Sequence, residues 1–375
     1  MIRSALLVLI AALVSLCCTA KKEPSAAGIG RRIIPIETTA FTGTHGALVV
    51  TGYGELMRTD DGGATWERVP REDALPFESV CFTDSLNGWA VDEPGHVLRT
   101  TDSGRTWVRL SKLDLGDYTI PVHVTFVDGL HGWVVDPFSI WVSEDGGITW
   151  ERHYPDLRIP DVLFASCFLS PKVGWLRGSG EALFRTDDGG RTWAARAIPV
   201  KAELRDILFI SESIGWIGAG EWDIVRDLPV GGLYRTEDGG DTWEQMTLPG
   251  PDTIIMSVNF VSEDEGWAVG SVEETADKSL RMSQEVALHT TDGGRTWDAV
   301  WVVNQDQASP YRRVFFADAQ HGWIVGEAIL YRTDDGGTTW REVLRLRSTD
   351  EEQDVGQLRR VDRRPALARH RRGSV

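Results

Sequence analysis

The chain has 375 residues, 16 of them tryptophan and 39 glycine, and a formal net charge of −17. This acidic balance argues against a nucleic-acid partner, because nucleic acids are bound through clustered lysine and arginine. The cysteines and histidines show no zinc-ligand spacing, so we expect no metal and no cofactor.

Residues 1–20 have the character of a signal peptide. Arg3 precedes an apolar run that is too short to span a bilayer, and small residues follow it. Export to a periplasm, a thylakoid-lumen-like compartment or the cell surface is therefore expected. Cys17 or Cys18, followed by a polar linker over residues 21–32, is also a candidate lipid-bearing residue. Cleavage and lipidation both stay open, and such a lipid anchor is the only membrane contact expected.

Residues 33–346 contain seven copies of an eight-residue phrase, the Asp box Ser/Thr-x-Asp-x-Gly-x-Thr-Trp, first seen at Thr59 to Trp66. The third-position aspartates follow one another at steps of 41, 43, 43, 50, 54 and 43 residues. A period of this length is typical of one four-stranded propeller blade. The sequence therefore predicts an all-β, seven-bladed β-propeller of four-stranded antiparallel blades, with one Asp box per blade, in a monomeric chain.

A second phrase, an aromatic residue followed seven positions later by the tryptophan of Gly-Trp, keeps step with the boxes. It runs from Phe82 to Trp89 in the second unit, and the first unit keeps its spacing from Phe41 to Leu48. Short apolar segments between turn residues are typical of strands. All seven units are therefore expected to be complete blades.

The box aspartates are predicted to be structural. An aspartate can accept hydrogen bonds from its own turn, and glycine can adopt positive φ. Each short turn supplies too few oxygens for the six to eight ligands of calcium. These aspartates are Asp61, Asp102, Asp145, Asp188, Asp238, Asp292 and Asp335.

Two neighbouring blades carry insertions on the face opposite the boxes. The interval from the Gly-Trp tryptophan to the box is twenty residues in blade five and twenty-three in blade six, against ten or eleven elsewhere. Insertion loops on a rigid scaffold often carry binding function, although simple tolerated insertions are an equal alternative. The candidate partner-binding residues there are Trp222, Asp223, Arg226, Glu273 and Glu274.

The central channel should open on the same face, beside the starts of the first strands. Four residues before each strand aromatic stand Glu37, Glu78, Val122, Phe164, Arg205, Met256 and Arg312. One side of the mouth is then acidic and another basic. Arg205, Arg312 and Arg313 are candidates for binding a carboxylate or acidic peptide, and pairing with Asp206 or other local acids is the alternative.

The C-terminal segment, residues 347–375, is rich in arginine and poor in apolar residues. We expect it to be disordered, with a basic contact arm as the alternative.

The whole repeat unit, from the strand aromatic through Gly-Trp to Arg-Thr-x-Asp-Gly-Gly-x-Thr-Trp, resembles the photosystem II stability and assembly-factor family of bacterial-neuraminidase-repeat propellers. The resemblance implies a non-catalytic exported or lumenal propeller that binds assembling membrane proteins, sometimes as a lipoprotein. Photosynthetic members present an arginine-rich patch to their partner. Here Arg205, Arg312 and Arg313 are a reduced version of that patch.

The alternative is a glycoside hydrolase, because Asp boxes also occur in sialidases and xyloglucan-type glucanases. Such an enzyme needs two carboxylates spaced across the sugar. Glu37 and Glu78, at the mouths of adjacent blades, are the candidate pair. Xyloglucan-type enzymes build their cleft between two propellers, however, and this chain supplies one.

Overall fold

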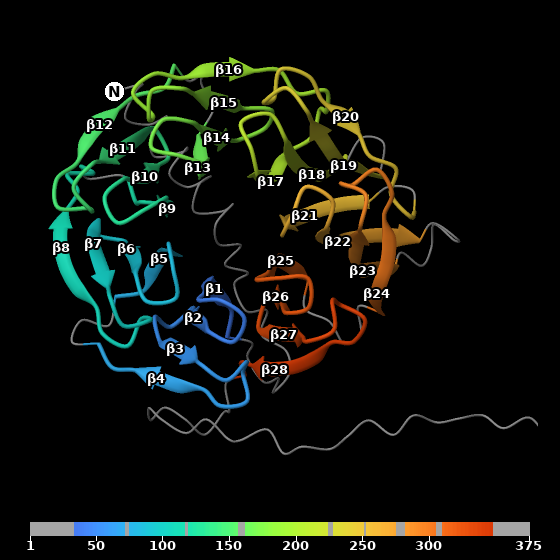
Figure 1. Cartoon of the computed structure of the whole chain (residues 1–375), viewed down its shortest axis with the longest axis horizontal. Helices are drawn as coiled ribbons and strands as arrows, with labels where there is room; N and C mark the ends of the chain where they lie inside the picture. Colours follow the sequence, from blue (N-terminus) through green and yellow to red (C-terminus); the bar gives the residue numbers. More distant parts are fainter. Residues whose placement is uncertain are drawn as a thin grey trace, which may run out of the picture.

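The computed structural model describes residues 34–71, 75–116, 119–156, 162–223, 228–250, 253–274, 282–304 and 310–347. Over these ranges the chain forms seven four-stranded antiparallel sheets arranged as a ring around a central channel (Figure 1). The predicted seven-bladed propeller is confirmed. Within the same ranges no helix is long and apolar enough to cross a membrane.

Each blade uses four consecutive strands, and the first strand is innermost (Figure 1). The strands of blades one to three are β1 (Ile36–Phe41), β2 (Ala47–Thr51), β3 (Leu56–Thr59), β4 (Glu67–Val69), β5 (Phe77–Phe82), β6 (Gly88–Asp92), β7 (His96–Thr100), β8 (Val108–Lys112), β9 (His123–Phe126), β10 (Gly132–Asp136), β11 (Ser139–Ser143) and β12 (Glu151–His153). Those of blades four and five are β13 (Leu163–Phe168), β14 (Gly174–Gly178), β15 (Leu183–Thr186), β16 (Ala194–Arg196), β17 (Leu204–Phe209), β18 (Gly215–Asp223), β19 (Leu228–Thr236) and β20 (Glu244–Gln245). Blades six and seven comprise β21 (Thr253–Phe260), β22 (Gly266–Glu274), β23 (Met282–Thr290), β24 (Asp298–Asn304), β25 (Tyr311–Phe316), β26 (Gly322–Gly326), β27 (Ile329–Thr333) and β28 (Arg341–Arg345).

The Gly-Trp tryptophans of blades two to seven each pack against the following blade, whereas blade one carries Leu48 at this position. Trp133 of blade three is 1% exposed and stacks on Phe168 of blade four with ring centroids 3.6 Å apart. Its indole Nε1 donates to the carbonyl of Gly189 in the next box at 2.8 Å. Burial of a large ring with its N–H paired favours a single packing arrangement. Equivalent stacking pairs join blades two to three, four to five, five to six and six to seven.

The ring closes between blades seven and one without exchange of a strand. Trp323 lies tilted against Phe41 with centroids 5.6 Å apart, a looser contact than in the other junctions. Phe41 stacks instead on Phe315 at 4.7 Å. Trp66 Nε1 donates to the carbonyl of Val343 at 3.0 Å. Closure therefore depends on side chains from both ends of the repeat array.

The first turn of each blade and its Asp box lie on one face. In blade three, for example, the amide of Gly146 in the box donates to the carbonyl of Leu130 in the first turn at 2.8 Å. The same bond forms in all seven blades. The second-to-third-strand turns therefore lie on the opposite face, as predicted.

Cys81 and Cys167 are free thiols. Burial raises their pKa to about 12 and about 11. Because a thiolate is the reactive form, both side chains behave as core residues.

Candidate functional site: the channel mouth opposite the Asp boxes

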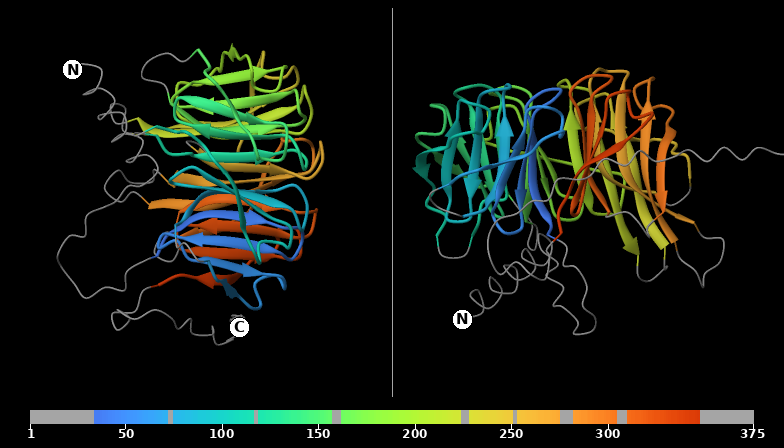
Figure 2. Two further views of the ribbon diagram at one scale, coloured as in Figure 1. Left: turned by 90° about the vertical axis from the view of Figure 1, so that its left-hand side faces the viewer. Right: turned by 90° about the horizontal axis from the view of Figure 1, so that it is seen from below.

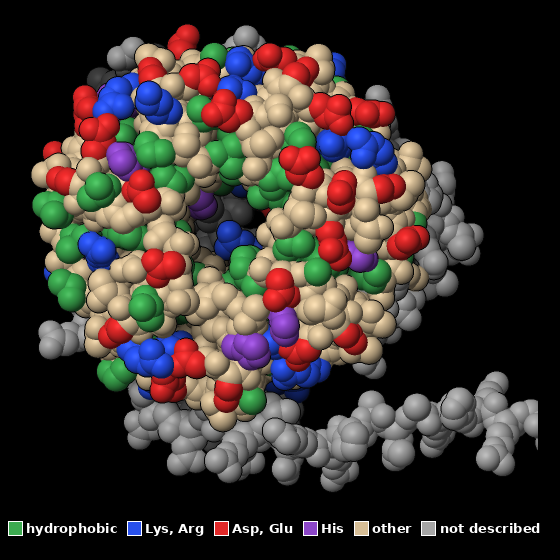
Figure 3. Space-filling model, viewed as in Figure 1, with side chains coloured by type: hydrophobic (Ala, Val, Ile, Leu, Met, Phe, Trp, Pro, Cys, Tyr) green, Lys and Arg blue, Asp and Glu red, His purple; other side chains and the backbone are tan. Residues whose placement is uncertain are grey.

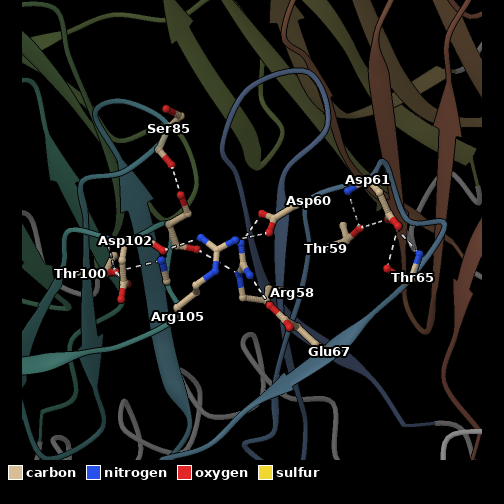
Figure 4. A network of polar contacts seen from close by, with 12 residues as sticks. Arg58, Thr59, Asp60, Asp61, Thr65, Glu67, Ser85, Thr100, Asp102 and Arg105 are labelled. Atoms are coloured by element: carbon tan, nitrogen blue, oxygen red, sulfur yellow. Dashed lines mark hydrogen bonds and ion pairs between the residues drawn. The ribbon is translucent and has the colours of Figure 1, made fainter.

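Each box aspartate accepts hydrogen bonds from residues of its own turn. Asp61 accepts the amide of Thr65 at 2.8 Å, the hydroxyl of Thr65 at 2.7 Å and the hydroxyl of Thr59 at 2.8 Å (Figure 4). Although partial burial opposes the shift, these bonds hold its pKa below the ordinary value. The same bonds lower the pKa of Asp238 and Asp292 to about 2. The carboxylates are therefore ionised and committed to the turn.

Charges beside the boxes also join neighbouring blades. Arg58 is nearly fully buried and contacts Asp60 and Glu67 (Figure 4). Asp60 in turn accepts from Arg105 of the second box at 2.5 Å. Arg191 reaches Glu144 of the third box in the same way. Such pairs link boxes across blade boundaries, so much of the charge on this face serves the scaffold.

The seven residues predicted to ring the mouth share a feature that the sequence did not reveal. In β5, Phe77 pairs with Asp92 and Ser79 pairs with Val91, so that Glu78 is skipped by the ladder. The predicted residue is skipped in the same way in blades one, four, five, six and seven. In blade three, Val122 shares one partner, Val135, with the following residue. Bulges of this kind redirect a side chain at the edge of a sheet.

Contacts place these bulged residues on the face opposite the boxes. A Cβ on Gly52, in the β2–β3 turn, would lie 3.1 Å from the Glu37 carboxylate. Arg205 Nε donates to the carbonyl of Gly220 in β18 at 2.7 Å. Arg312 lies 3.6 Å from Glu327, in the β26–β27 turn. The mouth and the long hairpins therefore share one face.

The acidic side of the mouth lies on blades one and two. Burial raises the pKa of Glu78 to about 7, with further contributions from Glu93, Glu37 and Asp92. Glu78 is therefore partly protonated near neutral pH. Its charged neighbours are acids, which gives this side a concentrated negative potential.

The three predicted arginines are not brought together. Arg205, on blade five, forms an ion pair with Glu203 at 3.1 Å and not with Asp206. Arg313 Nη1 donates to the carbonyl of Thr39 at 3.2 Å and so joins blade seven to blade one. Arg312 keeps 48% of its side chain exposed. Of the three, Arg312 is thus best placed for an outside carboxylate.

The insertions form strands where the sequence predicted loops. In blade five, β18 and β19 continue pairing as far as Asp223 with Leu228. In blade six, β22 and β23 pair as far as Glu274 with Met282. Figure 2 shows the yellow and orange strands reaching beyond the other blades on this face. The insertions therefore lengthen the central hairpins of blades five and six on the face that carries the mouth.

Several predicted residues lie at or beyond the limit of what is described. Trp222 and Asp223 have their backbone in β18, and Glu273 and Glu274 have theirs in β22. Arg226, Cys17 and Cys18 lie outside the described residues. Among the residues that are described, no group of three or more His, Cys, Asp or Glu is arranged to hold a metal ion.

Sequence reasoning missed a polar group in the channel. His123 Nδ1 accepts the amide of Ser166 at 3.3 Å. Burial, with Arg313 and Arg177 nearby, lowers its pKa to about 3, so the imidazole is neutral. These residues come from blades three, four and seven, and no repeat position marks them as a set.

Similarity to known proteins favours the assembly factors over the glycoside hydrolases. The family model described as "Photosynthesis system II assembly factor YCF48" matches residues 31–116, 109–195, 154–250 and 193–314. These segments together cover more than half of the chain. The chain belongs to the YCF48 family. A relative from Synechococcus sp. (strain CC9902), the photosystem II assembly lipoprotein Ycf48, is 26% identical over 202 residues, which are 51% of this chain and 47% of the relative. The match thus spans about half of that relative's length.

Solved structures agree on the fold. YCF48 bound to D1 peptide matches with a TM-score of 0.60 and 20% identity, over 83% of this chain and 98% of that one. YCF48 from Cyanidioschyzon merolae matches with a TM-score of 0.62 and 18% identity, over 82% of this chain and 97% of that one. An ancestral GH74 enzyme also gives 0.62, but at 12% identity and over 48% of its own length. At these identities the likeness shows the propeller alone.

Membership of an assembly-factor family identifies the chain as a non-enzymatic propeller. The hydrolase alternative, with Glu37 and Glu78 as its carboxylates, is therefore not supported. Burial and neighbouring acids account for the raised pKa of Glu78 without a catalytic role.

Proposed function

We propose that this protein is an exported scaffold that binds a peptide segment of a membrane protein during assembly of a photosystem-type complex. The family match over residues 31–314 carries this proposal. A structure of a related propeller is described as bound to D1 peptide, and we assign a peptide of that kind to this chain as well.

The channel mouth is the part of the surface that best fits such a partner. Its bulged residues stand outside the strand ladders, so the scaffold does not dictate their identity. An extended segment crossing the mouth from Arg312 of blade seven toward blades one and two meets first a cation and then the Glu37 and Glu78 carboxylates. Opposite charges on the partner would fix its direction.

We further propose that the protein works on the exported side of a membrane and is held there by a lipid on Cys17 or Cys18. The Synechococcus relative is named a lipoprotein. The apolar run and cysteines of residues 1–20 supply the matching sequence. Mass spectrometry of the protein from its own membranes would reveal a lipidated cysteine, and an unmodified soluble form would contradict the anchor.

Capture from detergent-solubilised membranes of the source organism tests the scaffold role. We expect the wild type to recover a membrane protein, and Arg312→Glu or Glu37→Lys to lose it. Arg295→Glu is the matched control, because Arg295 is 60% exposed in the sixth box on the opposite face. Equal capture by all four proteins, or by none, would refute the assignment to the mouth.

A further inference from the structure

The box face carries an aliphatic patch on blades two and three. Of the six large hydrophobic side chains exposed among the described residues, four lie there, namely Leu86, Val108, Leu130 and Ile148, and they are 51–63% exposed. Figure 3, which views this face, shows hydrophobic side chains gathered over these two blades, at its left-hand side.

The propeller itself does not require aliphatic residues at these positions. Leu86 and Leu130 occupy the first-turn position whose carbonyl accepts an amide from the box, a bond that all seven blades make. The other five blades place His45, Lys172, Ser213, Asp264 and Gln320 there. The backbone geometry is therefore the same whether the side chain is polar or apolar.

The other two members of the patch follow the same rule. Ile148 is the sixth residue of its box, where three other boxes carry arginine. Val108 follows the box tryptophan, where blades one, three and five carry glutamate. Blades two and three thus carry large aliphatic residues at three repeat positions where the other blades carry polar residues or, at Ala64 and Ala194, alanine. Exposed apolar patches of this kind mark interaction sites.

Ionised acids surround the aliphatic side chains. Asp84 accepts the amide of Leu86 at 2.7 Å, and Asp128 accepts that of Leu130 at 2.7 Å. These bonds help to hold the pKa of both carboxyls below the ordinary value. Two arginines of the neighbouring boxes are already paired with acids, Arg105 with Asp60 and Arg191 with Glu144. The rim is therefore negative, and it suits a partner with positive charge.

We propose that this patch, independently of the mouth, binds a protein segment whose aliphatic side chains are flanked by lysine or arginine. The negative rim disfavours an anionic membrane surface. The four side chains alone form a small surface compared with the roughly 800 Å² that one partner contributes to a stable interface. This area fits a transient client better than a permanent second copy. The protein then has two docking faces, one at each end of its channel.

Photo-crosslinking tests this proposal, with a photoreactive residue in place of Leu130 and, as control, in place of Gln320. Both proteins are mixed with solubilised membranes of the source organism. We expect position 130 to give a protein adduct whose mapped segment contains aliphatic residues beside lysine or arginine. Its yield should fall at least fivefold with Leu86→Ser and Ile148→Arg, which introduce residues that other blades already carry. The same fall is not expected with Thr338→Arg, the equivalent change in blade seven.

Other results would overturn it. Crosslinking from position 130 to lipid or to a second copy of this chain would contradict the proposal. So would a crosslinked segment without basic residues, or a crosslinking yield no higher than from position 320. Melting temperatures of the variants show whether the fold survives. Peptide binding at the mouth should be unchanged in Leu86→Ser, so failure of this proposal is distinguishable from failure of the proposed function.

Discussion

The two faces of the ring differ in what their charged residues do. On the box face, carboxylates such as Asp188 satisfy their own turns, and pairs such as Arg105 with Asp60 join blades. On the opposite face, Glu37 and Arg312 stand at bulges that the ladders skip. Repetition therefore marks the scaffold, and variation at the bulged position marks the surface at the mouth that we propose binds a partner.

Removing a blade junction should have the largest effect. Trp133→Ala removes a buried ring, its stacking on Phe168 and its bond to Gly189, so we expect a loss of about 3–5 kcal/mol in the free energy of unfolding. Leu130→Ala, nearby on the exposed surface, should cost less than about 0.5 kcal/mol. Chemical denaturation measures both. Equal losses would contradict the assignment of Gly-Trp to the scaffold.

Removing a box carboxylate should have an intermediate effect. Asp188→Ala deletes the acceptor for Thr186 and for the amide and hydroxyl of Thr192. We expect a loss of about 1–3 kcal/mol in stability with peptide binding intact. Calcium or a chelator should leave the melting temperature of the wild type unchanged, and a calcium-dependent rise would show that the boxes hold metal.

The acidic mouth should give an effect that appears as a dependence of stability on pH. The folded-state pKa of Glu78 is raised from 4.5 to about 7. Its contribution to stability is therefore fully present below about 4.5 and is lost as pH rises through about 7. Glu78→Gln should melt close to the wild type at pH 5 and above it at pH 8. If the difference in melting temperature between the two proteins is the same at both pH values, the pKa of Glu78 is not raised in the folded state.

The box spacing predicted the blades because each ladder pairs strands that are close in sequence. The mouth positions were also predictable, since Glu37, Glu78 and Arg312 share one offset from the strand aromatic. The bulges at these positions could not be predicted. Strand pairing resumes at the residue after each bulge, so the bulge does not change the repeat spacing in the sequence. The sequence also could not show that Arg313 and Arg312 have different roles. Arg313 donates to the carbonyl of Thr39, which lies 274 positions away in the chain.

Titration of a labelled D1 peptide against the purified protein tests the central claim most directly. We predict saturable binding, weakened at least tenfold by Arg312→Glu and unchanged by Arg295→Glu on the opposite face. Absence of saturable binding, or equal weakening by both variants, would contradict the account of the channel mouth as the partner site.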